Sequence, residues 1–189
     1  MNMQASASRL VERSTPIPEL SICGVAFDRY VEDLESLQTL PASQIPVLAA
    51  AALERLLEQQ WKLPRMFCEP GEQSYQRHVL YADPADRFTV LSLVWRPGQE
   101  TPVHGHTAWG VVGVYAGEPG VENYCLSDDG IASSGKLSCQ PGDVCYVQPG
   151  TEHPHRVFND SNDVAVTLHT YGRNLVTDPA SINIVLDQS

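Results

Sequence analysis

Apolar residues in the first third of the chain recur at the spacing of α-helices. In the segment Gly24–Leu37, an apolar side chain comes every three or four residues, as on one face of a helix. A second apolar stripe runs from Val47 to about Trp61, and Ser43 is a candidate N-cap in front of it. We therefore predict a helical N-terminal part over residues 24–61, after an irregular lead-in over 1–20 and before a Pro- and Gly-containing loop over 62–74.

After residue 74 the pattern changes to short stretches rich in β-branched and aromatic residues, of which Phe88–Trp95 is the clearest. Turn signals such as Pro-Gly, Asp-Gly and the pair Ser134-Gly135 separate these stretches. The predicted strands are 75–82, 88–95, 108–116, 121–126, 135–139, 144–147, 155–159, 164–171 and 182–186. Many short strands between regular turns predict a mainly β sandwich or barrel. We expect one domain over residues 1–189, in which the helical part packs on a barrel formed by 75–189 and its tail.

The composition narrows the classes of partner. The chain has 189 residues, and its net charge of -11, with twelve basic residues scattered along it, argues against nucleic acid and anionic membranes as partners. The N-terminus lacks the apolar core of a signal peptide, and no apolar run approaches the roughly 18 residues of a membrane span. Five cysteines without a Cys-x-x-Cys pattern are typical of free thiols. We expect a cytoplasmic protein.

Histidines supply the candidate chemistry. His104 and His106 are two residues apart, so in a β-strand both side chains point to the same face and can reach one metal ion. The segment Asp143–Asn159 repeats the arrangement of strand, Pro-Gly turn and histidine, with His153 and His155 as candidates. The pair alone is weak evidence for a metal site, and the second cluster strengthens it.

The two clusters resemble the two sequence motifs of the cupin superfamily. The matching residues are Gly98, His104, Gly105, His106 and Gly117 in the first motif, and Gly142, Pro149, Gly150, His155 and Asn159 in the second. The resemblance implies a double-stranded β-helix (jelly-roll) barrel and a metal site formed by His104, His106 and His155. His153 remains a rival third ligand by its spacing from the Pro-Gly turn, and Asn159 favours His155.

The acidic ligand that cupins usually carry shortly after the second histidine is absent, because Gly110 and Val111 occupy its place. Three neutral imidazoles leave a divalent metal its full charge, which favours an anionic thiolate or carboxylate as substrate. Imidazole ligands suit iron, zinc, copper and nickel.

A narrower resemblance, over about 28–171, is to the thiol dioxygenases, the family of cysteine dioxygenase and bacterial mercaptocarboxylate dioxygenases. Three segments carry it: Thr101–Gly110, His155–Asn159 and Thr167–Tyr171. The family implies Fe(II) as cofactor, and O₂ and a small carboxylate-bearing thiol as substrates, with a sulfinate as product. We expect L-cysteine as the thiol, with 3-mercaptopropionate and mercaptosuccinate as alternatives, and a monomer or weak homodimer.

The resemblance also implies roles for residues beyond the metal ligands. Thr167, His169 and Tyr171 alternate along one strand and so share one face, where they can form a hydrogen-bonded relay. The family has serine where this chain has Thr167. Arg77 matches the arginine that holds the substrate carboxylate in cysteine dioxygenases, which suits the planar fork of a guanidinium. We assign Tyr75 to the same substrate pocket and Arg173 as a second contact for an anion.

A function of another class stays open. A cupin barrel can also hold a small ligand without catalysis, or use zinc or manganese in an isomerase. The missing acidic ligand and the Thr-x-His-x-Tyr run favour the dioxygenase.

Overall fold

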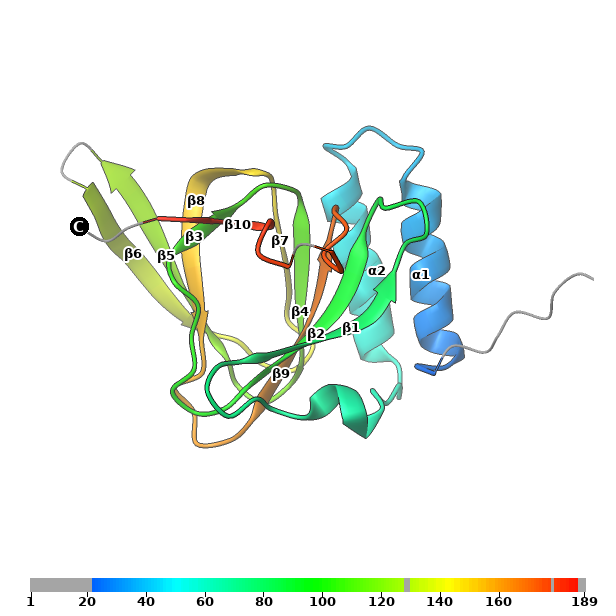
Figure 1. Ribbon diagram of the computed structural model, residues 1–189, viewed down its shortest axis with the longest axis horizontal. Helices are drawn as coiled ribbons and strands as arrows, with labels where there is room; N and C mark the ends of the chain where they lie inside the picture. The colour runs from blue at the N-terminus through cyan, green and yellow to red at the C-terminus, as the bar shows by residue number, and fades with distance from the viewer. Residues whose placement is uncertain (1–21, 128–129, 178, 187–189) are drawn as a thin grey trace, which may run out of the picture.

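The computed structural model describes residues 22–127, 130–177 and 179–186, which form two α-helices, one 3₁₀ helix and ten strands (Figure 1). The strands are β1 (Gln76–Ala82), β2 (Thr89–Trp95), β3 (His104–His106), β4 (Gly110–Ala116), β5 (Gly120–Ser127), β6 (Gly130–Ser138), β7 (Val144–Val147), β8 (Gly150–Phe158), β9 (Ala165–Tyr171) and β10 (Asn183–Val185). The irregular lead-in predicted for residues 1–20 lies outside the described residues.

Both predicted helices form, α1 over Val25–Leu37 and α2 over Ile45–Glu58. The prediction of Ser43 as N-cap is wrong. Helix α2 begins one residue after Gln44, whose side chain makes no capping hydrogen bond, and Pro46 lies in the first turn. Proline costs nothing there, because the first amides of a helix have no partner within it.

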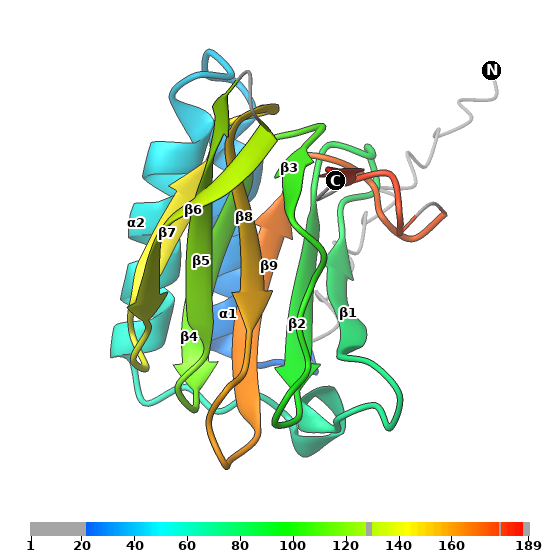
Figure 2. The same cartoon turned by 90° about the vertical axis from the view of Figure 1, so that its left-hand side faces the viewer.

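The strands form two five-stranded sheets, in the orders β1-β2-β9-β4-β7 and β10-β3-β8-β5-β6, and all their pairings are antiparallel. Figure 2 shows β6, β5, β8 and β3 side by side in front of the other sheet. The two sheets face each other, and both helices lie against the outer side of the first sheet (Figure 1). The chain thus has the predicted mainly β, double-stranded β-helix fold.

Strands β2 and β9 are buried on both faces, because they lie between the helices and the barrel interior. Along β2, Val90 and Val94 belong to the core shared with the helices, whereas Leu91, Leu93 and Trp95 belong to the core inside the barrel. This alternation is the period of two of a strand. The inner face of β9, the strand next to β2, carries side chains of the candidate site. Within the described residues, neither helix has the length and apolar character needed to traverse a bilayer.

Three local predictions need correction. The predicted turn at Ser134-Gly135 does not form: β6 runs through it, Gly135 has φ 151°, and the β5–β6 register shifts opposite, between Asn123 and Tyr124. An extra residue in one strand produces this kind of bulge, which glycine accommodates. Strand β8 begins at Gly150 rather than at His155. The predicted loop 62–74 contains a 3₁₀ helix, Arg65–Cys68.

Candidate metal centre

Two neighbouring strands bring three histidines together. His104 and His106 are the ends of the three-residue strand β3, and His155 lies on β8 directly opposite His104. A glycine is required between the first two, because a Cβ at Gly105 would collide with the backbone carbonyl of Gly150. The His-Gly-His sequence therefore lets β3 pack tightly on the start of β8.

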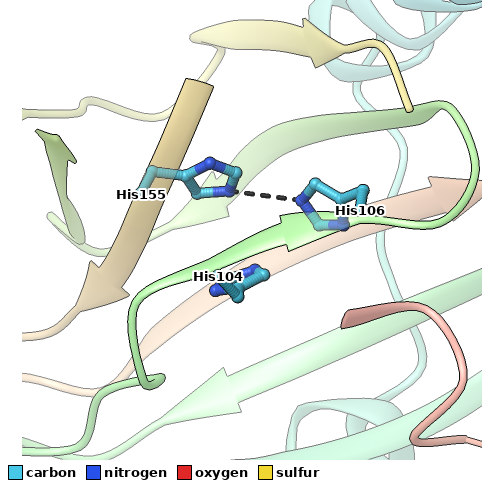
Figure 3. Close-up of side chains that lie close together, drawn as sticks. All are labelled: His104, His106 and His155. Atoms are coloured by element: carbon cyan, nitrogen blue, oxygen red, sulfur yellow. Dashed lines mark hydrogen bonds between the residues drawn. The ribbon is translucent and has the colours of Figure 1, made fainter. Parts of the chain in front are cut away.

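The three imidazoles converge (Figure 3). Their candidate ligand atoms all lie within 4.8 Å of one another, and the Nε2 atoms of His106 and His155 are 3.3 Å apart. Two nitrogens bound to one ion at about 2.0–2.1 Å are separated by roughly 2.8–3.4 Å when they occupy adjacent positions. The spacing therefore fits a shared metal ion.

Backbone carbonyls fix two of the rings. The Nδ1–H of His104 donates to the Pro102 carbonyl at 3.0 Å, and that of His155 donates to the His153 carbonyl at 3.1 Å. Such bonds leave the lone pair on Nε2, as in most histidines that bind metals. His106 differs, because its Nδ1 is buried without a hydrogen-bond partner among the described residues. Only the contact with His155 orients that ring through a nitrogen.

Burial keeps the three rings neutral. Removal from water lowers the pKa of His104 to about 4 and that of His106 to about 2, and it also lowers the pKa of His155. Neutral imidazoles have lone pairs to offer at neutral pH, so the cluster suits a divalent cation. The rival His153 has an exposed side chain and lines the same cavity, but it is not part of the cluster. No carboxylate of the described residues joins the three histidines.

Opposite this cluster, the three side chains predicted on β9 form a continuous hydrogen-bonded relay. Thr167 Oγ1 is 2.8 Å from His169 Nε2, and His169 Nδ1 is 2.8 Å from the Tyr171 hydroxyl. All three side chains are buried. The Tyr171 ring lies 5.6 Å from the His106 ring, centroid to centroid, so the relay ends beside the metal centre.

Trp95, which sequence reasoning did not assign to the site, sets the direction of the relay. Its indole N–H can only donate, and it donates to Thr167 Oγ1 at 2.9 Å. Among the described residues, the Thr167 hydroxyl hydrogen then has only His169 Nε2 as acceptor. His169 therefore carries its hydrogen on Nδ1 and donates it to the Tyr171 oxygen. This leaves the Tyr171 O–H to donate into the cavity.

Burial also fixes the charge states of the relay. It lowers the pKa of His169 to about 3, with a further contribution from the positive charge of Arg77. It raises the pKa of Tyr171, so the phenol keeps its hydrogen. A neutral histidine and a neutral phenol make Tyr171 a hydrogen-bond donor at neutral pH.

The predicted substrate residues divide into two groups. Arg77 and Tyr75 line the same cavity as the metal centre, and Arg77 Nη2 donates to the Tyr75 hydroxyl at 3.0 Å. Arg77 Nη1 donates to the Pro179 carbonyl at 2.7 Å, so the guanidinium is held from two sides. Arg173, by contrast, has an exposed side chain and is not among the described residues that line the cavity. The structure does not bring it to the site.

The cavity that contains both groups has a volume of about 880 Å³. Its described lining residues include six valines and two leucines from both sheets, and Arg77 is the single Arg or Lys among them. Two asparagines, Asn123 and Asn183, also line it. Sequence reasoning missed both. Only their place on strands beside the histidines identifies them, since Asn123 lies opposite His155 and Asn183 opposite His106.

No protein-family model matches the sequence. A conserved protein with a double-stranded β-helix domain from Klebsiella pneumoniae subsp. pneumoniae MGH 78578 is 15% identical, with a TM-score of 0.49 over 69% of this chain and 100% of that chain. A cupin superfamily protein from Desulfitobacterium hafniense DCB-2 is also 15% identical, with a TM-score of 0.45 over 61% and 94%. Oxalate decarboxylase of Bacillus subtilis, which has Mn(II) centres, is 21% identical, with a TM-score of 0.43 over 64% and 29%. Similarity at this level carries no information about the activity of this chain.

Proposed function

We propose that the protein is a thiol dioxygenase of the cysteine dioxygenase family, which uses Fe(II) and O₂ to oxidise a small carboxylate-bearing thiol to its sulfinate. L-Cysteine is the leading substrate, and 3-mercaptopropionate and mercaptosuccinate are the alternatives. The observation that carries the proposal is the relay of Thr167, His169 and Tyr171, which ends beside three neutral histidines with no carboxylate among them.

In this proposal His104, His106 and His155 hold the iron. When bound, Fe(II) supplies the redox chemistry by which O₂ is reduced and sulfur oxidised, and it favours the thiolate form of a coordinated thiol. Both atoms of O₂ pass to sulfur, so one thiol and one O₂ give one sulfinic acid. No further reductant is needed.

The other residues bind and orient. Arg77 is already fixed by the Tyr75 hydroxyl and the Pro179 carbonyl, so its remaining N–H groups can take a carboxylate without further ordering. The Tyr171 O–H donates toward the substrate or oxygen at the metal centre, with its direction set by His169.

Metal analysis and oxygen uptake test the proposal. Freshly purified protein should contain iron and should consume O₂ when L-cysteine, 3-mercaptopropionate or mercaptosuccinate is added. Arg77→Gln removes the charged donor and should raise KM for the accepted thiol by about 10- to 100-fold, since a hydrogen bond to a charged group contributes about 1.5–3 kcal/mol. Arg173→Gln is the matched control, and it should leave KM unchanged because Arg173 lies outside the cavity.

One observation favours a second candidate, a cupin that binds a small apolar ligand without oxidising it. The cavity of about 880 Å³ lies near the upper end of the roughly 300–1,000 Å³ range of pockets for drug-sized ligands, and its walls are mostly apolar. Zinc or manganese in the purified protein, together with no thiol-dependent O₂ uptake, would sink the dioxygenase and favour a function of this other class.

A further inference from the structure

The C-terminal segment Pro179–Val185, which we call the C-terminal strap, forms part of the site. Its strand β10 pairs with β3, the strand that carries two of the three histidines. Backbone hydrogen bonds continue beyond the strand, from Thr107 N to the Ile182 carbonyl and from Leu186 N to the Val103 carbonyl, each at 2.9 Å. The strap therefore covers the free edge of β3 along its whole length.

Two further contacts hold the strap in place. The Thr107 hydroxyl donates to the Ser181 carbonyl at 2.7 Å, and the Ile182 side chain is 1% exposed within the core of the barrel. The strap also accepts the hydrogen bond from Arg77 at Pro179. The same short segment thus holds both the Arg77 guanidinium and the metal-binding strand β3.

Asn183 is the strap residue that faces the cavity. It pairs with His106, and residues directly opposite one another in an antiparallel pair point to the same face of the sheet. It lines the cavity, and its carboxamide makes no hydrogen bond within the described residues. A carboxamide NH₂ offers two donors. Asn183 lies opposite His106, and Pro179, whose carbonyl holds Arg77, comes four residues earlier in the strap.

We propose that Asn183 is a specificity-determining residue, which donates a hydrogen bond to the substrate carboxylate together with Arg77. The proposal rests on the proposed function and deepens it, because it replaces Arg173 as the second contact and limits the substrate class. Arg77 is the one cationic Arg or Lys among the described lining residues, while Asp143 and Glu152 line the same cavity with carboxylates. The site therefore takes thiols with one carboxylate, because no second Arg or Lys among the described lining residues can pair with another carboxylate.

L-Cysteine and cysteamine differ only in the carboxylate, so together they test this role. In the full-length, iron-loaded protein, Asn183→Ala should raise KM for L-cysteine about tenfold and change kcat less than twofold, while kcat/KM for cysteamine stays within twofold. Asn183→Asp should weaken L-cysteine further through repulsion between like charges. For the wild type, kcat/KM for mercaptosuccinate should be at least tenfold below that for 3-mercaptopropionate.

Asn123→Ala is the matched control, because it removes the same group from the opposite side of the histidine cluster. It should leave the ratio of kcat/KM between L-cysteine and cysteamine unchanged. An equal loss for both thiols in Asn183→Ala, or no loss for either, overturns the proposed role. Mercaptosuccinate used as well as 3-mercaptopropionate overturns the limit to one carboxylate.

Anaerobic calorimetry separates failure of this inference from failure of the proposed function. The Kd of L-cysteine should also rise about tenfold in Asn183→Ala. If no thiol supports O₂ uptake but Asn183→Ala still weakens binding selectively for the carboxylate thiol, the proposed function fails and the role of Asn183 holds. If the wild type turns over and Asn183→Ala binds L-cysteine as tightly as the wild type, the role of Asn183 fails alone.

Discussion

Thr167→Val tests the buried relay most directly, because it changes one oxygen to a methyl group and keeps the shape of the side chain. The Thr167 hydroxyl joins Trp95 Nε1 at 2.9 Å and His169 Nε2 at 2.8 Å, and all three side chains are at most 2% exposed. Water cannot replace the missing partner at such a position. The variant therefore leaves one buried donor and one buried acceptor unpaired.

The size of the effect follows from these two groups. Each unpaired buried group costs about 1–3 kcal/mol, so the two together cost about 2–6 kcal/mol. The added methyl offsets roughly 0.8 kcal/mol by its burial. We expect a net loss of about 1–5 kcal/mol in the free energy of unfolding. Turnover should fall as well, since nothing then fixes which nitrogen of His169 carries the hydrogen.

Urea unfolding followed by tryptophan fluorescence measures the loss, and oxygen uptake measures the turnover. Thr167→Ser is the matched control, because it keeps both hydrogen bonds and removes only the methyl group. It should retain most of the stability and turnover of the wild type. If Thr167→Val unfolds within about 0.5 kcal/mol of the wild type, or if the valine and serine variants behave alike, the relay does not exist as described.

Two other positions give sharp expectations. Gly110→Ala would place a Cβ 2.9 Å from two carbons of the Tyr171 ring, so the ring must shift. We expect kcat to fall at least tenfold, while the iron content measured by atomic absorption stays unchanged. An unchanged kcat would mean that Tyr171 does not need its present position. Hydrogen bonds from Ser133 and Arg156 hold the pKa of Glu122 at about 2, against an ordinary value of 4.5. A lowered pKa stabilises the fold above the ordinary value, and this stability is lost as the pH falls from 4.5 to about 2. Circular dichroism of Glu122→Gln should therefore show a weaker dependence of stability on pH in that window, and an unchanged curve would remove Glu122 as its cause.

Sequence periodicity predicted the fold well, because burial in this chain follows the local pattern. Strand β2 was predicted as 88–95 and runs from Thr89 to Trp95, and β9 was predicted as 164–171 and runs from Ala165 to Tyr171. Both lie in the centre of a sheet, where β-branched and aromatic residues are packed on two sides. Strands β6 and β8 were misjudged at their starts, because pairing with another strand rather than local preference decides where each begins. Pairing with β5 extends β6 to Gly130, and pairing with β3 extends β8 to Gly150.

Within the candidate site, residues that share one strand could be placed on one face from the sequence. The period of two put His104 with His106, and Thr167 with His169 and Tyr171. The donor that directs the relay could not be found in this way. Trp95 is 72 residues from Thr167 in sequence, and it reaches Thr167 only because β2 and β9 pair in one particular register.

The second carboxylate contact illustrates the same limit. Arg173 follows Tyr171 by two residues, and a strand that continued would have pointed its side chain to the same face. Strand β9 instead ends at Tyr171, and the chain turns so that Arg173 is exposed. The C-terminal strap then returns along β3, and Asn183 lines the cavity where the sequence pattern predicted Arg173. The net charge at this end of the site is therefore one lower than the sequence suggests, and this is the basis on which we propose a substrate with a single carboxylate.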